Sequence, residues 1–177
     1  MKNNISFDLE TFGISANSHV LSIGVAGFDI DTGTVEWTRH YKMGTADQPG
    51  RVICGKTVEW WLSQSAEARD SVIGSNCCLS EALNEISSLV KVGPSYVWGN
   101  GATFDISILE HAYNDLNQQI PWPFWDIRDM RTIVALAESL RGFDRKSILR
   151  KGTHHSAVDD AVYQAKVISA AYAALRS

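Results

Sequence analysis

Residues 5–11 read Ile-Ser-Phe-Asp-Leu-Glu-Thr, and this stretch decides the fold that we expect. Apolar and polar residues alternate from Ile5 to Leu9, which is typical of a β-strand. Residues two apart on a strand share a face, so Asp8 and Glu10 point the same way. Two buried carboxylates repel each other and lose hydration. Either a divalent cation offsets this cost on a central strand, or the pair lies on the wet face of an edge strand.

The rest of the chain predicts an α/β protein. A strand–strand–strand meander is followed by alternating helices and strands, which is typical of a sandwich around a mixed sheet. Gly93-Pro94 is expected to end one helix. Further strands are expected at 20–30, 34–41 and 96–98, and helices at 57–64, 80–90 (capped by Ser80), 103–116, 129–140 and 156–175.

The bulk composition fits one domain over residues 1–177 with a sizeable core. The hydrophobic share is 45% and the charged share 20%, as in ordinary globular proteins. No apolar run is long enough to cross a bilayer, and the N-terminus has no apolar signal region. Cys54, Cys77 and Cys78 have no disulfide or zinc-site spacing. We therefore expect a cytoplasmic protein with free thiols and no membrane partner.

The charge is unevenly distributed along the chain. The net charge of -4 speaks mildly against a nucleic-acid partner, but bound cations would neutralise an acidic site. Residues 128–151 carry seven positive and three negative side chains, a local charge of +4. This stretch either holds a phosphate backbone or is an ordinary solvated surface.

Asp105 is a third acid that interrupts an apolar pattern. It is expected in the first turn of the helix 103–116, four residues before Leu109 and seven before Ala112, on the buried stripe. An acid in the first turn also interacts favourably with the helix dipole. Asp105 is therefore either an inward-facing ligand or a residue that stabilises its own helix.

The last helix opens with residues 154–161, His-His-Ser-Ala-Val-Asp-Asp-Ala. Ser156 and Asp159 have capping-box spacing, so we interpret Asp159 as structural. Asp160 lies on or beside the buried stripe, and we interpret it as functional. His155 precedes the cap in backbone that we expect to be mobile, which suits a base that moves as substrate binds. A purely structural histidine is the alternative.

Four acids and a histidine are typical of phosphodiester chemistry. Two divalent ions roughly 3.5–4 Å apart can activate water and stabilise the leaving oxygen. Mg²⁺ and Mn²⁺ prefer oxygen ligands such as carboxylates. A histidine near its ordinary pKa can take a proton from the attacking water at neutral pH.

Three motifs resemble those of the DEDDh branch of the DnaQ-like exonuclease superfamily. They occur in the family's order and extend over nearly the whole domain. The sister branch has a tyrosine four residues before the last acid, where this chain has Ser156. The motifs are Phe7-Asp-Leu-Glu-Thr11, Asn100-Gly-Ala-Thr-Phe-Asp105 and His155-x-Ala-x-x-Asp160-Ala161.

The resemblance implies a fold, a cofactor and an activity. The fold is a ribonuclease H-like three-layer sandwich with a mixed central sheet flanked by helices. Two metal ions, Mg²⁺ or Mn²⁺, would be held by Asp8, Glu10, Asp105 and Asp160, with His155 as the general base. The enzyme would release nucleoside 5'-monophosphates from the 3' ends of single-stranded DNA or RNA or of 3' overhangs. Relatives often pair, so a homodimer is also an expectation.

Further segments outside these motifs carry a finer resemblance: Thr57-Val-Glu-Trp-Trp61, Gln64, Ala68-Arg69, Pro121-Trp-Pro123 and Arg128-Asp-Met-Arg-Thr132. They resemble those of a compact phage and bacterial subgroup. That subgroup includes proteins labelled exodeoxyribonuclease VIII-like and a mycobacterial 3'-5' exoribonuclease, so its labels leave the sugar open.

Four residues beside the motifs are candidates for substrate binding: Thr11, Phe12, Asn100 and Trp60. Phe12 either stacks on the terminal base or packs in the core. Asn100 either bonds substrate or holds its turn. Trp60 lies off the apolar stripe of its helix, whereas Trp61 lies on it and is expected in the core.

Trp122 and Trp125 are expected to seal the sheet, and Asp129 to cap a helix. Two other classes of function stay open: a non-catalytic nucleic-acid-binding module on the same fold, and a metal-free protein whose acids are merely solvated.

Overall fold

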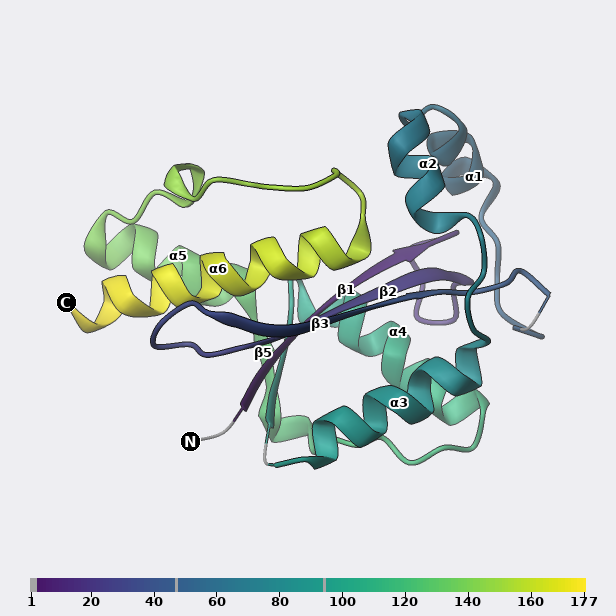
Figure 1. Cartoon of the computed structure of the whole chain (residues 1–177), viewed down its shortest axis with the longest axis horizontal. Coiled ribbons are helices and arrows are strands. Elements are labelled where there is room, and N and C mark those ends of the chain that lie inside the picture. Colours follow the sequence, from purple (N-terminus) through teal and green to yellow (C-terminus); the bar gives the residue numbers. More distant parts are fainter. Residues whose placement is uncertain (1–2, 47, 94) are drawn as a thin grey trace.

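The computed structural model describes residues 3–46, 48–93 and 95–177 and has three layers (Figure 1). Its middle layer is a five-stranded sheet. The first three strands form the predicted antiparallel meander. The fourth strand pairs in parallel with the first, and the fifth strand pairs in parallel with the fourth. The sheet has the order β3-β2-β1-β4-β5, with β1 (Asn3–Thr11), β2 (Val20–Phe28), β3 (Val35–Lys42), β4 (Ser95–Gly99) and β5 (Ile127–Asp129).

Helices cover both faces of this sheet (Figure 1). α3 (Leu79–Lys91) and α4 (Ala102–Asp115) lie on one face, and α5 (Met130–Arg141) and α6 (Ala157–Arg176) lie on the other. α1 (Gly55–Leu62) and α2 (Ala66–Val72) stand apart, beyond the end at which α6 begins. The short turns η1 (Phe124–Asp126) and η2 (Arg145–Ser147) flank α5. The predicted mixed sheet between helical layers is thereby confirmed.

The alternation read from residues 5–9 separates the two faces of the central strand. Ile5, Phe7 and Leu9 are buried in the core beneath α3 and α4. A second core fills the space between the sheet and the helices α5 and α6. Asp8 and Glu10 lie on the opposite side of β1 from its apolar residues, so the prediction that they share a face of a central strand is confirmed.

Gly24 lets α6 approach the sheet at the point where the acids lie. It pairs with Asp8 across β1 and β2. A Cβ atom at Gly24 would lie 2.0 Å from the carbonyl carbon of Ala157, where α6 begins. Because no side chain separates these backbones, the first turn of α6 rests directly on β2, beside Asp8 of the neighbouring strand β1. The absence of a side chain at this position therefore brings Asp160 to the strand that carries Asp8.

The structure corrects several local predictions. α2 lies in a segment for which we predicted no element, and the three residues before α5, Ile127–Asp129, form the short strand β5 that we did not predict. Helix α3 begins after Cys78 rather than at Ser80, and the Cys78 N–H donates to Glu81 Oε2 (2.9 Å). The predicted stop at Gly93-Pro94 falls partly on Pro94, which lies outside the described residues.

Each of these misses has a local cause. The segment that forms α2 is short and weakly periodic, and a three-residue strand has no readable alternation.

Among the described residues, no helix has the length and apolar character needed to cross a membrane.

Candidate active site

Four carboxylates from three elements meet at the end of the sheet where the strands β1 and β4 terminate. β1 supplies Asp8 and Glu10, the first turn of α4 supplies Asp105, and the first turn of α6 supplies Asp160. They line a cleft of about 340 Å³. The rest of the lining is made by Leu9, Asn100, Phe104, Met130, Arg145, Arg150, His154, His155, Tyr163 and Gln164.

Hydrogen bonds fix two of these carboxylates in place. Gln164, one turn after Asp160 on α6, donates from Nε2 to Asp8 Oδ1 (2.6 Å). Its own Oε1 accepts from Ser6 Oγ (3.2 Å), so the amide is held from the strand as well. Asp105 Oδ1 accepts the backbone N–H of Leu9 (3.1 Å), which ties α4 to β1. The acids are therefore oriented by neighbours rather than left free in solvent.

Asp129 supports the helix that carries Asp105. Its Oδ1 accepts the N–H of Thr132 at the start of α5 (3.1 Å), which confirms the predicted cap. Its Oδ2 accepts the N–H of Ala102 at the start of α4 (2.6 Å). One carboxylate thus caps two helices, and it fixes the turn from which Asp105 enters the cleft.

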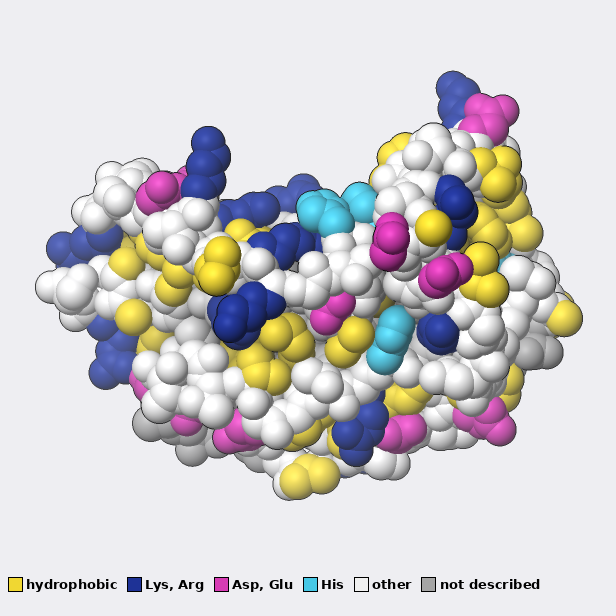
Figure 2. Space-filling view, turned by 45° about the horizontal axis from the view of Figure 1, so that its top comes forward, with side chains coloured by type: hydrophobic (Ala, Val, Ile, Leu, Met, Phe, Trp, Pro, Cys, Tyr) yellow, Lys and Arg dark blue, Asp and Glu magenta, His cyan; other side chains and the backbone are white. Residues whose placement is uncertain are grey.

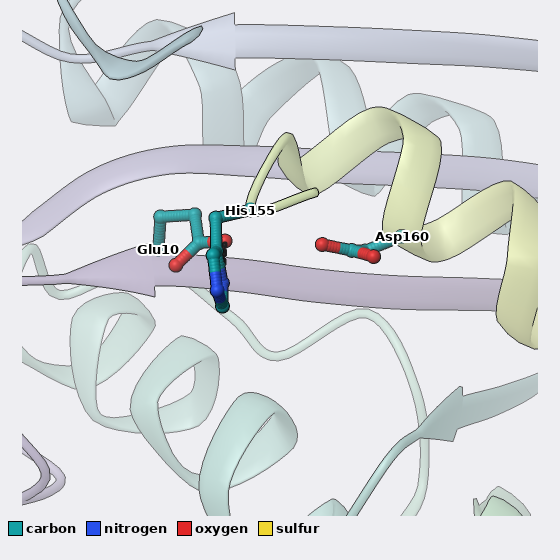
Figure 3. A group of neighbouring side chains, drawn as sticks. All are labelled: Glu10, His155 and Asp160. Carbon is teal, nitrogen blue, oxygen red and sulfur yellow. Dashed lines mark ion pairs between the residues drawn. The ribbon is translucent and has the colours of Figure 1, made fainter. Parts of the chain in front are cut away.

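Glu10, His155 and Asp160 can surround a single ion (Figure 3). One ligand atom from each lies within 4.8 Å of the others. The Asp160 carboxylate is directed from α6 toward the side where Glu10 and His155 lie next to each other. Carboxylate oxygens in this number and proximity suit a hard divalent cation. These three residues could therefore hold one divalent cation, whereas the predicted ligands Asp8 and Asp105 do not belong to this group of described residues.

Burial and crowding raise the pKa values of three of the acids. Burial raises the pKa of Asp8 well above its usual range, and the charges of Asp105 and Glu10 add to the effect. Burial and then the charge of Asp105 raise the pKa of Glu10 to about 8. Burial raises the pKa of Asp105 to about 7. Without a cation, several negative charges are unfavourable here, and a divalent ion would reverse that.

His155 is held at the mouth of the cleft by a neighbouring helix. Its backbone is left-handed (φ 63°), and its carbonyl accepts a hydrogen bond from Ser71 Oγ of α2 (2.8 Å). Its Nδ1 lies 3.9 Å from Glu10 Oε1. Burial, then the positive charges of His154 and Arg150, lower the pKa of His155. This lowering favours the neutral ring, which is the state that a general base requires.

Positive side chains border the same cleft. Arg145 and Arg150 line it, and Arg131 donates from Nε to Asn100 Oδ1 (3.3 Å). Figure 2 shows histidines and dark blue Lys and Arg side chains side by side at a hollow next to the raised part formed by α1 and α2. Part of the predicted basic stretch therefore faces the acids and does not merely lie in solvent.

The four predicted substrate-binding residues lie at different distances from the acids. Asn100 lines the cleft. Trp60 is 41% exposed and contacts the His155 ring edge-to-face (centroids 5.0 Å apart). Thr11 is buried and donates to the Gly13 carbonyl (2.5 Å), and Phe12 packs partly buried against the small core beneath α1 and α2. Thr11, Phe12 and Trp60 are not among the described residues that line the cleft, although Trp60 contacts His155, which does.

The other tryptophans divide into core and surface. Trp61 is buried, as predicted, and its Nε1 donates to the Thr11 carbonyl (3.0 Å). Trp122 is buried against Phe7, which confirms that it seals the sheet. The same prediction for Trp125 is wrong, because Trp125 is 62% exposed on the short turn η1. A rigid proline-containing segment does not by itself indicate which of its aromatic rings faces inward.

The prediction for the start of α6 is wrong in one detail. Ser156 is the N-cap residue by position, but its side chain makes no capping hydrogen bond. Asp159 instead accepts the backbone N–H of Thr153 (2.8 Å), so it holds the preceding loop. Asp159 therefore has the structural role that we predicted, but its partner is the Thr153 N–H and not the capping box with Ser156. Asp160, as predicted, is buried and faces the cleft.

Among the cleft residues that sequence reasoning did not single out, Gln164 and Arg150 contact the acids directly. Gln164 had a readable signal, since a polar residue four positions after Asp160 falls on the same helix face. Arg150 had only its place in the basic stretch, which does not reveal that one member turns inward.

The order of the mixed sheet and the layers of helices on its two faces agree with the ribonuclease H-like fold that the resemblance implies. The chain matches the family model described as the 3'-5' exoribonuclease Rv2179c-like domain over residues 3–172. The chain therefore belongs to this family of 3'-5' exonucleases.

Individual relatives share less than a third of their residues with this chain. The chain is 28% identical to an exodeoxyribonuclease of Enterobacteria phage T4 in an alignment of 155 residues that covers 72% of this chain and 68% of that protein. The nuclease domain of 3'hExo, a DEDDh family member bound to rAMP, superposes with a TM-score of 0.60 at 11% identity, covering 95% of this chain and 90% of that one. The zinc-bound complex of E. coli ExoI with single-stranded DNA gives 0.69 at 16% identity, covering 99% of this chain and 40% of that one. These structures support the fold.

Proposed function

We propose that this chain uses divalent cations to hydrolyse the phosphodiester bond at the 3' end of single-stranded nucleic acid or a 3' overhang, releasing nucleoside 5'-monophosphates. The observation that carries the proposal is the convergence of Asp8, Glu10, Asp105 and Asp160 beside His155 in one cleft. Distant parts of the chain supply these side chains, so their meeting is a property of the fold.

Mg²⁺ or Mn²⁺ would be held by the four carboxylates. When bound, two such cations stabilise the charge that develops on the attacking and leaving oxygens. Without them, burial and then the charge of Asp105 raise the pKa of Glu10 to about 8, because a negative charge is unfavourable there. The zinc ion named for the E. coli ExoI complex is consistent with a metal site on this fold.

The protein's own residues orient the reaction and move a proton. His155 accepts the proton of the attacking water, since burial and nearby positive charges favour its neutral ring. Gln164 fixes the Asp8 carboxylate, and the Leu9 N–H fixes that of Asp105. Trp60, beside His155, offers an exposed ring on which a terminal base can stack.

The polymer is single-stranded in this proposal, and its sugar is left to experiment. The family description names an exoribonuclease and the phage relative is named an exodeoxyribonuclease. RNA is distinguished from DNA by contacts to the 2'-hydroxyl. Matched RNA, DNA and 3'-overhang substrates, assayed side by side, measure the preference.

The decisive experiment follows 5'-labelled oligonucleotides in Mg²⁺ or Mn²⁺, with EDTA as the metal-free condition. A ladder of products shortened from the 3' end is expected. Asp8→Asn should lower the rate about a hundredfold or more, since metal stabilisation is worth several kcal/mol. Asp70→Asn, on the exposed surface of α2, is the matched control. Equal rates for Asp8→Asn and the control would refute the proposal, and so would activity that survives EDTA.

The proposal extends to the state of the protein in the cell. Cys54, Cys77 and Cys78 are free thiols, which fits a reducing cytoplasm. We also propose, from the sequence, that residues 1–177 form one exonuclease domain and that two copies of the chain form a homodimer. Light scattering on the purified protein distinguishes monomer from dimer.

A further inference from the structure

Arg150 places a permanent positive charge inside the acidic cluster. It lies between η2 and α6, and its Nη2 forms an ion pair with Asp160 Oδ1. The guanidinium carbon lies 5.0 Å from the centre of the Tyr163 ring, which supports the group from one side. The charge of Arg150 also acts on Asp8 and Glu10, lowering the pKa of both against the effect of burial. Arg150 is therefore the counter-ion of these acids when no metal is bound.

This position conflicts with metal binding. Asp160 is one of the three residues whose ligand atoms can surround an ion, and the guanidinium is bound to the same carboxylate. An arginine does not lose its proton in a protein, so it cannot yield the site by becoming neutral. A cation that binds Asp160 must therefore displace the Arg150 side chain.

The displaced side chain has a use in the same cleft. Arg150 Nε is buried and has no hydrogen-bond partner among the described residues. Arg145 lines the cleft too, so the Arg150 guanidinium would remain near another positive charge, where an anion is needed to neutralise both. A planar guanidinium binds phosphate oxygens through two parallel hydrogen bonds. Neither a helix nor a strand holds the backbone that carries Arg150, because the segment from Ile148 to Ser156 contains neither. Within this segment, Gly152 has a φ of 91°.

We propose that Arg150 is an exchangeable counter-ion: it neutralises Asp160 in the metal-free protein, leaves it when divalent cations bind, and then contacts a phosphate group of the substrate. This inference rests on the proposed function, because it assumes that the acids bind metal. In the metal-free protein Arg150 competes with the cation for Asp160, and in the metal-loaded protein it helps to bind the substrate. A merely structural arginine would not produce this combination.

Calorimetric titration with Mn²⁺ tests the first half. Arg150→Met removes the competing charge and keeps the apolar stem, so Mn²⁺ should bind about tenfold more tightly, which corresponds to ~1.4 kcal/mol. Lys151→Met, which removes a neighbouring exposed charge, is the control and should leave the affinity unchanged. If Arg150→Met does not fold, Arg150→Gln removes the same charge in a more polar side chain.

Titration of the Mn²⁺-loaded protein with AMP and dAMP tests the second half, because these probes carry a phosphate and no bond to hydrolyse. Arg150→Met should bind them about tenfold more weakly, the loss expected for a charge-assisted hydrogen bond. Unchanged or weaker Mn²⁺ binding by this variant would overturn the exchange, and unchanged mononucleotide affinity would overturn the phosphate contact. A wild-type protein that binds no Mn²⁺ would instead overturn the proposed function itself.

Discussion

Replacing Gly24 with alanine should separate α6 from the sheet. The added Cβ would lie 2.0 Å from both the carbonyl carbon and oxygen of Ala157 and 2.4 Å from the N of Val158. Carbon atoms in contact normally stay about 3.5–4.0 Å apart, so the two backbones must move by more than 1 Å. Overpacking costs about 1–3 kcal/mol, and backbone on both sides favours the upper end of that range.

Thermal unfolding followed by circular dichroism measures this cost. For a chain of this size, about 3 kcal/mol corresponds to a fall in Tm of roughly 6–12 °C. Gly55→Ala is the matched control, because nothing lies within 4 Å of its added Cβ and Gly55 opens helix α1. Alanine there should leave the Tm unchanged or raise it slightly. A Gly24→Ala protein that melts within 2 °C (about 1 kcal/mol or less) of the control would refute the close approach of α6.

Three further predictions concern the site and its supports. Because burial raises the pKa of Glu10 to about 8 and of Asp105 to about 7, above their unfolded values, the metal-free protein should lose stability as the pH rises from about 4 to about 8. Urea unfolding in EDTA should show this loss and added Mn²⁺ should reverse it; a flat profile would contradict the crowding. Asp129→Ala leaves the first turns of two helices uncapped and should cost about 1–2 kcal/mol in the same assay, whereas a change under 0.5 kcal/mol would mean that the caps contribute nothing. Trp60→Ala should weaken oligonucleotide binding about tenfold in fluorescence anisotropy without lowering the Tm, while Phe124→Ala, remote and exposed, should not change binding.

The sheet and the four acids were readable from the sequence for different reasons. The alternation at residues 5–9 identified the central strand, because side chains on the two faces of β1 meet different surroundings. Asp105 and Asp160 could be placed because each interrupts an apolar helical stripe. The meeting of Asp160 with Asp8, however, depends on the close packing allowed by Gly24, and no periodicity indicates that.

Tertiary contacts account for what the sequence did not reveal. The hydroxyl of Ser71 holds the His155 carbonyl from a helix that is 84 residues away in the chain. The side chain of Asp159 caps nothing and binds a loop N–H instead, although its spacing from Ser156 is that of a capping box. Trp125 faces solvent while its neighbour Trp122 is buried, a difference set by the short turn η1. In each case a distant partner or the local backbone decides the outcome.

The central claim is that Asp8, Glu10, Asp105 and Asp160 form one two-cation centre. Anomalous diffraction from crystals soaked in Mn²⁺ tests it most directly, because the signal locates the metal. We expect two peaks in the cleft, about 3.5–4 Å apart and in contact with these carboxylates, with the Arg150 side chain moved away from Asp160. A cleft without peaks at saturating Mn²⁺, or peaks that lie only on other surface acids, would contradict the account.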